Sequence, residues 1–314
     1  MDDKVIITVT VDSTASYPRN EFMPRIEDFH AVADEYVRAI DAGAALVHHH
    51  GVHHLEQEIQ SDGRRLSRTD YDGWAGLTQS IRSRRDAIIQ FGIASARIDE
   101  KIRLLDLHPD MMSFAFNAHD EFFQPDPAYP PIEQYSIHPR EELEVFCAAA
   151  QAHGVKPDVE AFYTGALFNL EYIRSKGLLD DPVWATLFLG WRGGGWTPPT
   201  PDALLFFVRH LPPRVNWTLS VMNPQLQWRL LAVALGIGGH VRVGWEDNPY
   251  LPDGRPSRSN AELVDAIVAL ARLLGREPAS PDEARAIIGL PVQTAPRADD
   301  AGGQTIVTEG SGTR

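Results

Sequence analysis

The sequence has 314 residues, of which 43% are hydrophobic and 23% are charged, so it can bury a sizeable core as one large α/β domain or as two smaller domains. Its net charge of −14 argues against non-specific binding to nucleic acid or to an anionic membrane, but leaves room for a local arginine pocket that holds a small anion. Cys147 is the single cysteine, which excludes an internal disulfide and fits a reducing cytoplasm.

The first residues, MDDKVIITVTVDS, have the pattern of a strand and not that of a signal peptide. The sequence contains no apolar run that approaches the ~18 residues a membrane helix needs. We therefore expect a cytoplasmic protein that does not interact with a membrane.

Short β-rich runs alternate with helical patterns along the chain. The runs are residues 5–11, 44–50, 87–93, 111–116, 155–162, 183–190, 214–221 and 239–245. The helical patterns at 27–43 and 139–154 end at Gly43 and Gly154, and glycine is a usual residue at the end of a helix. Thr200 and Ser280, each followed by proline and an acidic residue, are predicted to begin later helices.

Eight such alternations match an α/β fold of the (β/α)8 (TIM) barrel type, whose usual size is ~250 residues. The rival is a doubly wound sheet, which would usually carry a glycine-rich loop after its first strand. The segment that follows the first strand here, DSTASYPRN, has no glycine. We therefore predict a single catalytic barrel domain over residues 1–290. Residues 291–314 are predicted to be a tail that is flexible or lies over a neighbouring subunit.

Five histidines lie at the end of the second predicted strand and just beyond it. Catalytic groups of such barrels sit at the C-terminal ends of the strands. Because side chains alternate along a strand, His48 and His50 share one face and His49 takes the other. Two imidazoles on an inward face form a platform for Zn²⁺ or a similar ion. His49, His53 and His54 are interpreted as residues without a metal role.

A metal site with two histidines needs a third protein ligand, often a carboxylate. The last predicted strand is followed by Glu246 and Asp247, and in a closed barrel this strand lies next to the first and close to the second. Arg242 comes from the same strand. Arg242 and Asp247 are equally compatible with a structural ion pair that closes the barrel.

Several segments together resemble the β-keto acid cleavage enzymes. They are AGAALVHHH, PDVEAF, LGWRGGGWTPPTPDAL, GGHVRVGWEDNPYLPDG and the region that begins SNAELV, and the resemblance spans roughly residues 5–290. The resemblance implies a zinc-dependent (β/α)8 barrel that condenses a β-keto acid with acetyl-CoA, giving acetoacetate and a CoA ester of the shortened acid. It also implies a homo-oligomer, namely a tetramer.

The motifs of the family imply roles for individual residues. The implied zinc ligands are His48, His50 and Glu246. The implied catalytic residues are Arg242, Asp247 and Glu160, with Asp158 where the family usually has a first glutamate. In this scheme Asp247 removes the α-proton and Arg242 holds Asp247 ionised, because an adjacent cation lowers the pKa of a carboxylate. Glu160 orders the substrate or relays protons, or else is a structural residue paired with a nearby lysine or arginine.

A CoA molecule is long and anionic, so it needs a groove and cations at the mouth of the barrel. The segment WRGGGWTP at 191–198 supplies Arg192, three glycines and two tryptophans. Glycine allows the backbone to approach a phosphate or an amide closely. We interpret Arg192 as a CoA contact, with a tight βα loop as the alternative.

The sequence departs from the family around the expected substrate. Val52 stands where the family has an arginine, and Ala15 stands where an acid would meet an amino substrate. Gly92, Phe114 and Phe116 replace smaller or hydroxylic residues. Because a buried cation without a partner is disfavoured, we expect a neutral or apolar β-keto acid to be preferred over an amino-substituted one.

Two other functions remain open. One is a metal-dependent aldolase or hydrolase on the same barrel that does not use CoA, since one fold hosts many chemistries. The other is a binding protein without catalysis, against which the presence of the His48–His50 pair, Arg242, Glu246 and Asp247 argues.

Overall fold

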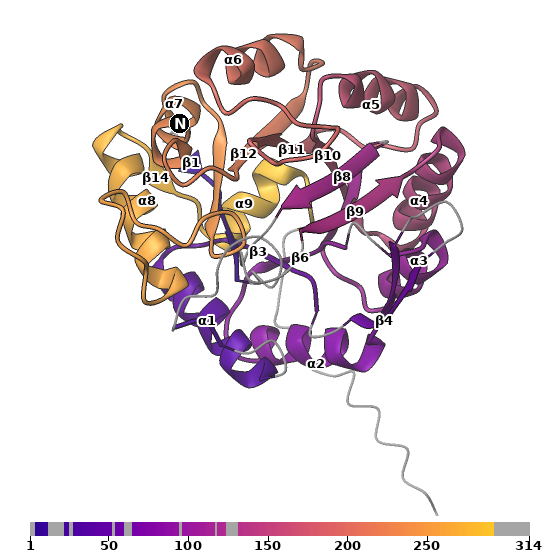
Figure 1. Cartoon of the computed structure of the whole chain (residues 1–314), viewed down its shortest axis with the longest axis horizontal. Helices are drawn as coiled ribbons and strands as arrows, with labels where there is room; N and C mark the ends of the chain where they lie inside the picture. The colour runs from indigo at the N-terminus through magenta and orange to yellow at the C-terminus, as the bar shows by residue number, and fades with distance from the viewer. Residues whose placement is uncertain are drawn as a thin grey trace, which may run out of the picture.

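The computed structural model describes residues 4–11, 22–24, 28–51, 54–59, 65–93, 96–116, 118–123 and 131–291. Eight parallel strands close into a barrel in the order β10-β11-β12-β13-β2-β3-β6-β7 (Figure 1). Their bounds are β2 Ile7–Thr10, β3 Leu46–His49, β6 Ile88–Phe91, β7 Met111–Ala115, β10 Lys156–Ala161, β11 Val183–Leu189, β12 Val215–Val221 and β13 His240–Gly244. All eight predicted runs contain these strands, and the predicted TIM barrel is confirmed.

Helices surround the barrel as an outer ring (Figure 1). They are α1 Phe29–Ala42, α2 Tyr71–Arg82, α3 Ile98–Leu105, α4 Arg140–His153, α5 Gly165–Ser175, α6 Pro201–His210, α7 Gln227–Gly236 and α8 Asn260–Leu273. The predicted N-caps are confirmed, because the side chain of Thr200 accepts the Ala203 N–H and Ser280 forms a capping box with Glu283. Within the described residues, no helix is long and apolar enough to cross a membrane.

The sequence pattern missed two antiparallel hairpins and one short strand pair. The hairpins follow barrel strands: β4 His54–Ile59 with β5 Arg65–Thr69, and β8 Ala118–Phe123 with β9 Ile132–Ile137. Short strands β1 Lys4–Val5 and β14 Glu277–Pro278 pair with each other. The helix predicted to begin at Ser280 is α9 Pro281–Ile288, which packs across the centre of the ring (Figure 1). The hairpins after β3 and β7 lie beyond the C-terminal ends of these strands, where the catalytic groups of such barrels are found.

The interior of the barrel is apolar at the N-terminal end of the strands and polar toward the other end. The apolar layer packs on α9 and consists of Ile6, Ala45, Leu46, Ile88, Met111, Trp184, Ala279, Ala284 and Ile288. Above it lie buried polar side chains from many strands, namely Thr8, His48, Gln90, Asp158, Thr186, Thr218 and Arg242. Burying so many polar groups is costly unless they are paired. A fold that needed only a stable core would fill this space with apolar side chains, so we look for the functional site in this layer.

Strand β7 corrects an expectation about the substrate pocket. Phe114 packs outside the barrel, where its ring stacks on Phe146 of α4 at 4.3 Å between centroids. Phe116 belongs to the same helix-covered core, and Ala115 between them joins an inner cluster with Phe162 and Trp191. The prediction that these two phenylalanines change the pocket is therefore wrong, because alternation along the strand places both on its outer face.

Further expectations fall on residues outside the described ranges. They concern Ala15, Val52, His53 and almost the whole of the predicted tail, residues 292–314.

Candidate active site

The end of β3 presents alternate histidines to opposite sides of the barrel wall, as predicted. His49 faces the helices, where it contacts Trp74 and Phe91 and its Nδ1 accepts the N–H of Gly51 at 3.1 Å. The rings of His48 and His50 meet edge to face, 4.8 Å apart between centroids. His49 is therefore a packed core residue, and the other two point toward the interior.

Three potential metal ligands come together from β3 and from the turn after β13. One ligand atom each of His48, His50 and Glu246 lies within 4.8 Å of the others. His50 Nε2 lies 3.2 Å from Glu246 Oε1, while the buried Glu246 Oε2 has no hydrogen-bond partner among the described residues. Two imidazoles and one carboxylate are a common ligand set of catalytic zinc. The donor set and the unpartnered oxygen fit a divalent ion.

This juxtaposition follows from the closure of the barrel. Strand β13 pairs with β2, and β2 pairs with β3, so two segments about two hundred residues apart in sequence are separated by a single strand. His48 is fully buried, and burial, followed by the positive charge of Arg242, lowers its pKa well below the usual value. The imidazole is therefore neutral near pH 7, the form that binds a metal.

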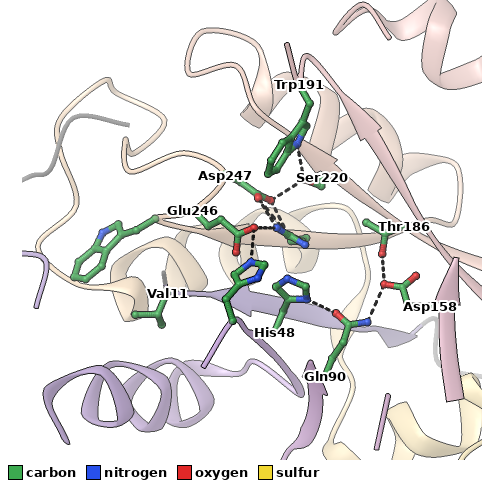
Figure 2. Close-up of polar contacts among 12 residues, drawn as sticks. Val11, His48, Gln90, Asp158, Thr186, Trp191, Ser220, Glu246 and Asp247 are labelled. Carbon is green, nitrogen blue, oxygen red and sulfur yellow. Dashed lines mark hydrogen bonds and ion pairs between the residues drawn. The ribbon is translucent and has the colours of Figure 1, made fainter. Parts of the chain in front are cut away.

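Arg242 of β13 is buried and pairs with both carboxylates that follow this strand. These are Glu246 and Asp247, which lie next to each other in Figure 2. One terminal nitrogen lies 2.6 Å from Glu246 Oε1 and 2.9 Å from Asp247 Oδ1, and Nε lies 3.1 Å from Asp247 Oδ2. Ser220 of β12 donates to Asp247 Oδ2 at 3.0 Å, and Trp191 Nε1 donates to Ser220 at 3.2 Å. The carboxylate of Asp247 is thus held in one orientation from two sides.

The two carboxylates differ in their pKa values. Burial raises the pKa of Asp247 to about 6, although Arg242 acts in the opposite direction. Burial also disfavours the charged form of Glu246, but here Arg242 and His50 outweigh it and lower the pKa below its usual range. The expectation that Arg242 lowers the pKa of Asp247 holds for that one interaction, but the net shift is upward because burial is the larger effect.

Glu160 and Asp158 point into the barrel from β10 and are both buried. The Glu160 carboxylate raises the pKa of Asp158 and that of Arg242, so it lies within electrostatic reach of the Arg242 pairs. It also acts on Lys101 of α3, a buried lysine whose pKa burial lowers to about 8. The sequence alone does not single out Lys101, because nothing in the amphipathic pattern of α3 separates it from an exposed lysine.

The loop that carries Arg192 packs against strand β8. A side chain at Gly193 would lie 1.9 Å from the carbonyl oxygen of Asp120, and the N–H of Gly195 donates to Asp120 Oδ1 at 3.0 Å. Glycine is therefore required here because the loop backbone packs closely against the hairpin strand β8. Arg192 itself is exposed, whereas Arg242 is buried.

Gly92 lies directly against the ring of His48. A Cβ at this position would lie 2.3 Å from Cε1 and 2.6 Å from Nε2 of the imidazole, and 2.9 Å from Ser113 Oγ. Glycine thus leaves the space that the His48 ring occupies. The buried hydroxyl of Ser113, which the sequence analysis overlooked, lies beside it.

A buried cluster of this kind at the C-terminal end of the strands defines a (β/α)8 barrel with a candidate metal centre in its mouth. Comparison with known proteins agrees with a (β/α)8 barrel and identifies the family. The chain matches the beta-keto acid cleavage enzymes over residues 4–290 and belongs to that family.

Two relatives with assigned functions match over nearly their whole length. The 3-keto-5-aminohexanoate cleavage enzyme of Acetoanaerobium sticklandii is 30% identical over 293 residues, which cover 92% of this chain and 99% of that protein. The 3-oxoadipate:acetyl-CoA acetyltransferase of Cupriavidus necator is 29% identical, with 93% and 96% covered. The structure of ObcA with oxaloacetate superposes with a TM-score of 0.65 at 19% identity, covering 87% of this chain and 68% of ObcA, and shows the shared fold.

Proposed function

We propose that this protein is a zinc-dependent enzyme that transfers the acyl part of a β-keto acid to CoA, with acetyl-CoA as the co-substrate and acetoacetate as the second product. Membership of the family supports cleavage of a β-keto acid. The name of the Cupriavidus necator relative supports acetyl-CoA as the partner. The observation that carries the proposal is the buried Arg242–Asp247 pair beside the cluster of His48, His50 and Glu246.

The ligand cluster is proposed to hold one divalent ion. When bound, such an ion supplies Lewis acidity that makes the α-carbon of a β-keto acid more acidic. The protein supplies the base, and we assign that role to Asp247. Arg242 and Ser220 orient its carboxylate, so the geometry for proton removal is established before substrate binds.

The remaining steps balance without an external oxidant or reductant. The α-carbanion attacks the thioester carbon of acetyl-CoA, a C–C bond forms, and the CoA thiolate leaves. The thiolate then adds to the original keto carbon and the C–C bond between this carbon and the α-carbon breaks. The products are a new acyl-CoA and the carbanion of acetoacetate, which takes back the proton. Glu160, at the same end of the barrel, is proposed to order the substrate or to relay that proton.

The acyl chain of the substrate is proposed to be neutral or apolar. An aromatic cluster supports this assignment: Phe162 stacks on Phe188 at 4.2 Å between centroids, and Trp191 meets both rings edge to face. The Phe188 ring lies 5.4 Å from the guanidinium carbon of Arg242, so the cluster borders the proposed catalytic pair. Apolar surface at this place favours an acyl chain without charge.

Other features are proposals of the same kind. Arg192 is proposed to contact CoA, and the protein is proposed to act in the cytoplasm as a homo-oligomer. Residues 1–290 are proposed to be one catalytic domain.

A panel of β-keto acids tests the function, incubated with acetyl-CoA and the zinc-loaded protein while acetoacetate and acyl-CoA are measured. We expect equal amounts of both products from at least one acid, and none when acetate replaces acetyl-CoA. Consumption of a keto acid without CoA would instead indicate an aldolase or a hydrolase.

A further inference from the structure

A chain of hydrogen bonds crosses the barrel below the proposed metal site and ends on His48 (Figure 2). His48 Nδ1 lies 2.7 Å from Gln90 Oε1, and Gln90 Nε2 donates to Asp158 Oδ2 at 2.8 Å. Thr186 donates to the same oxygen at 2.6 Å. These side chains come from β3, β6, β10 and β11, and each is at most 2% exposed. No part of the proposed reaction uses Gln90, Asp158 or Thr186.

The chain has a direction that starts at Asp158. Both bonds to Asp158 end on Oδ2, and this oxygen accepts them whether the carboxylate is ionised or carries a proton on Oδ1, so the amide group of Gln90 that faces it must be the NH₂. The amide oxygen then faces His48 and, because it only accepts, Nδ1 of the imidazole must carry the hydrogen. The lone pair of the neutral ring is left on Nε2, the nitrogen available to a metal.

Packing holds the same ring from its other side. Gly92 lies against this ring, and a Cβ at this position would lie 2.3 Å from Cε1 and 2.6 Å from Nε2. A flipped ring would lose the bond to Gln90, and leaving a buried hydrogen-bonding group without its partner is costly. The tautomer and the orientation of His48 are therefore fixed by separate contacts.

We propose that Gln90 and Asp158 are positioning residues that hold His48 as the Nδ1–H tautomer with Nε2 presented to the metal. The inference rests on the proposed metal site, and Thr186 supports it by orienting Asp158. Groups that orient a ligating histidine in this way change metal affinity by about 10–100-fold when they are removed.

The test uses the full-length protein freed of metal. The ¹⁵N chemical shifts of the His48 ring report its tautomer directly, without metal or substrate. Titration with Zn²⁺, and with Co²⁺ followed by its visible absorption, reports affinity and ligand geometry. Gln90→Met keeps the length of the side chain but neither accepts nor donates the two bonds. We expect this variant to lose the pure Nδ1–H form, to bind both ions about 10–100-fold more weakly, and to change the Co²⁺ spectrum.

Conservative variants separate positioning from a general loss of structure. Both bonds to Asp158 end on Oδ2, so the amide oxygen of Asp158→Asn can accept them, and we expect this variant to keep the tautomer and the affinity, while Asp158→Ala loses them. Thr218→Val is the matched control, because Thr218 is equally buried and its hydroxyl has no partner among the described residues. If Gln90→Met fails to fold, Thr186→Val removes one bond from the chain, and a smaller shift in the same direction is expected.

An unchanged His48 tautomer and unchanged metal affinity in Gln90→Met and Thr186→Val would overturn the inference. So would a wild-type protein that binds neither ion. Absence of β-keto acid cleavage would reject the proposed function but not this inference, because neither measurement depends on turnover.

Discussion

Arg242 and Asp247 are joined at three points inside the barrel, with Nε 3.2 Å from Oδ1 and 3.1 Å from Oδ2 and a terminal nitrogen 2.9 Å from Oδ1. Both side chains are almost inaccessible to solvent, at 2% and 0% exposure. A buried pair of this kind is not strong evidence of a stabilising role, because desolvation offsets much of the attraction. The pair fits the role proposed for Asp247, that of a base whose carboxylate Arg242 holds in place.

Replacement of Asp247 by asparagine tests the assigned base. The amide keeps the shape of the side chain but does not accept a proton, so we expect metal binding to persist and kcat to fall by about 10²–10⁴-fold. Steady-state kinetics with elemental analysis of the same samples measures both. Asp253→Asn, on an exposed turn, is the control and should retain full activity. A loss of less than about tenfold in Asp247→Asn would transfer the role of base to Glu160.

Removal of a ligand tests the metal site. His48→Ala and Glu246→Gln should each lose most of the bound ion, because two remaining protein ligands hold zinc poorly. His153→Ala serves as the control, since this partly exposed histidine on α4 pairs with Asp106 far from the cluster and should leave the metal content unchanged. Full metal occupancy in both ligand variants would show that the ion binds at another site and would contradict the proposed ligands.

Truncation of Arg242 should destabilise the fold as well as abolish turnover. Arg242→Ala leaves Glu246 and Asp247 buried without their shared cation, a change that typically costs about 3–5 kcal/mol. Urea unfolding of the metal-free protein measures this cost. The exposed pair of Arg255 and Asp253 offers the comparison, and Arg255→Ala should leave the free energy of unfolding nearly unchanged. Equal effects of the two substitutions would contradict the role of burial.

The pH dependence of stability should contain a contribution from Asp158. Burial, followed by the charge of Glu160, raises its pKa from 3.8 to about 7, so the folded state binds this proton more tightly than the unfolded state. The free energy of unfolding should therefore fall as the pH rises from about 4 to 7, by at most ~1.4 kcal/mol per pH unit from this group. Asp158→Asn should lack this contribution, so its stability relative to wild type should increase over the same range and level off above pH 7. A constant difference between the two proteins would show that Asp158 titrates normally.

Substrate preference separates a neutral acyl pocket from an amino-acyl pocket. We expect kcat/KM to be higher for a 3-oxohexanoate-like acid than for a 5-amino-3-oxohexanoate-like acid, because the aromatic cluster of Phe162, Phe188 and Trp191 offers no counter-ion. Kinetics with the two acids side by side decide the point. A clear preference for the amino compound would show that a carboxylate outside this cluster meets the ammonium group.

The sequence predicted the barrel because its signals are local. Eight β-rich runs with helical patterns between them indicate parallel strands, and the two-residue period placed His48 and His50 on one face. The cyclic order of the strands then brought Glu246 close to both, as the closure of a barrel requires. The terminal glycines and caps of the helices were equally readable, since each depends on a few neighbouring residues.

Tertiary structure alone decided which face of an apolar strand looks inward and which distant side chains meet. Strand β7 is buried on both faces, so alternation related Phe114 to Phe116 without showing that both lie outside. The bond of Gln90 to Asp158 joins side chains from strands that are not neighbours in the barrel, and the loop at Gly193 is shaped by Asp120 of a hairpin that the pattern missed. Such contacts depend on the packing of segments far apart in the chain. The conformational preferences of neighbouring residues do not predict them.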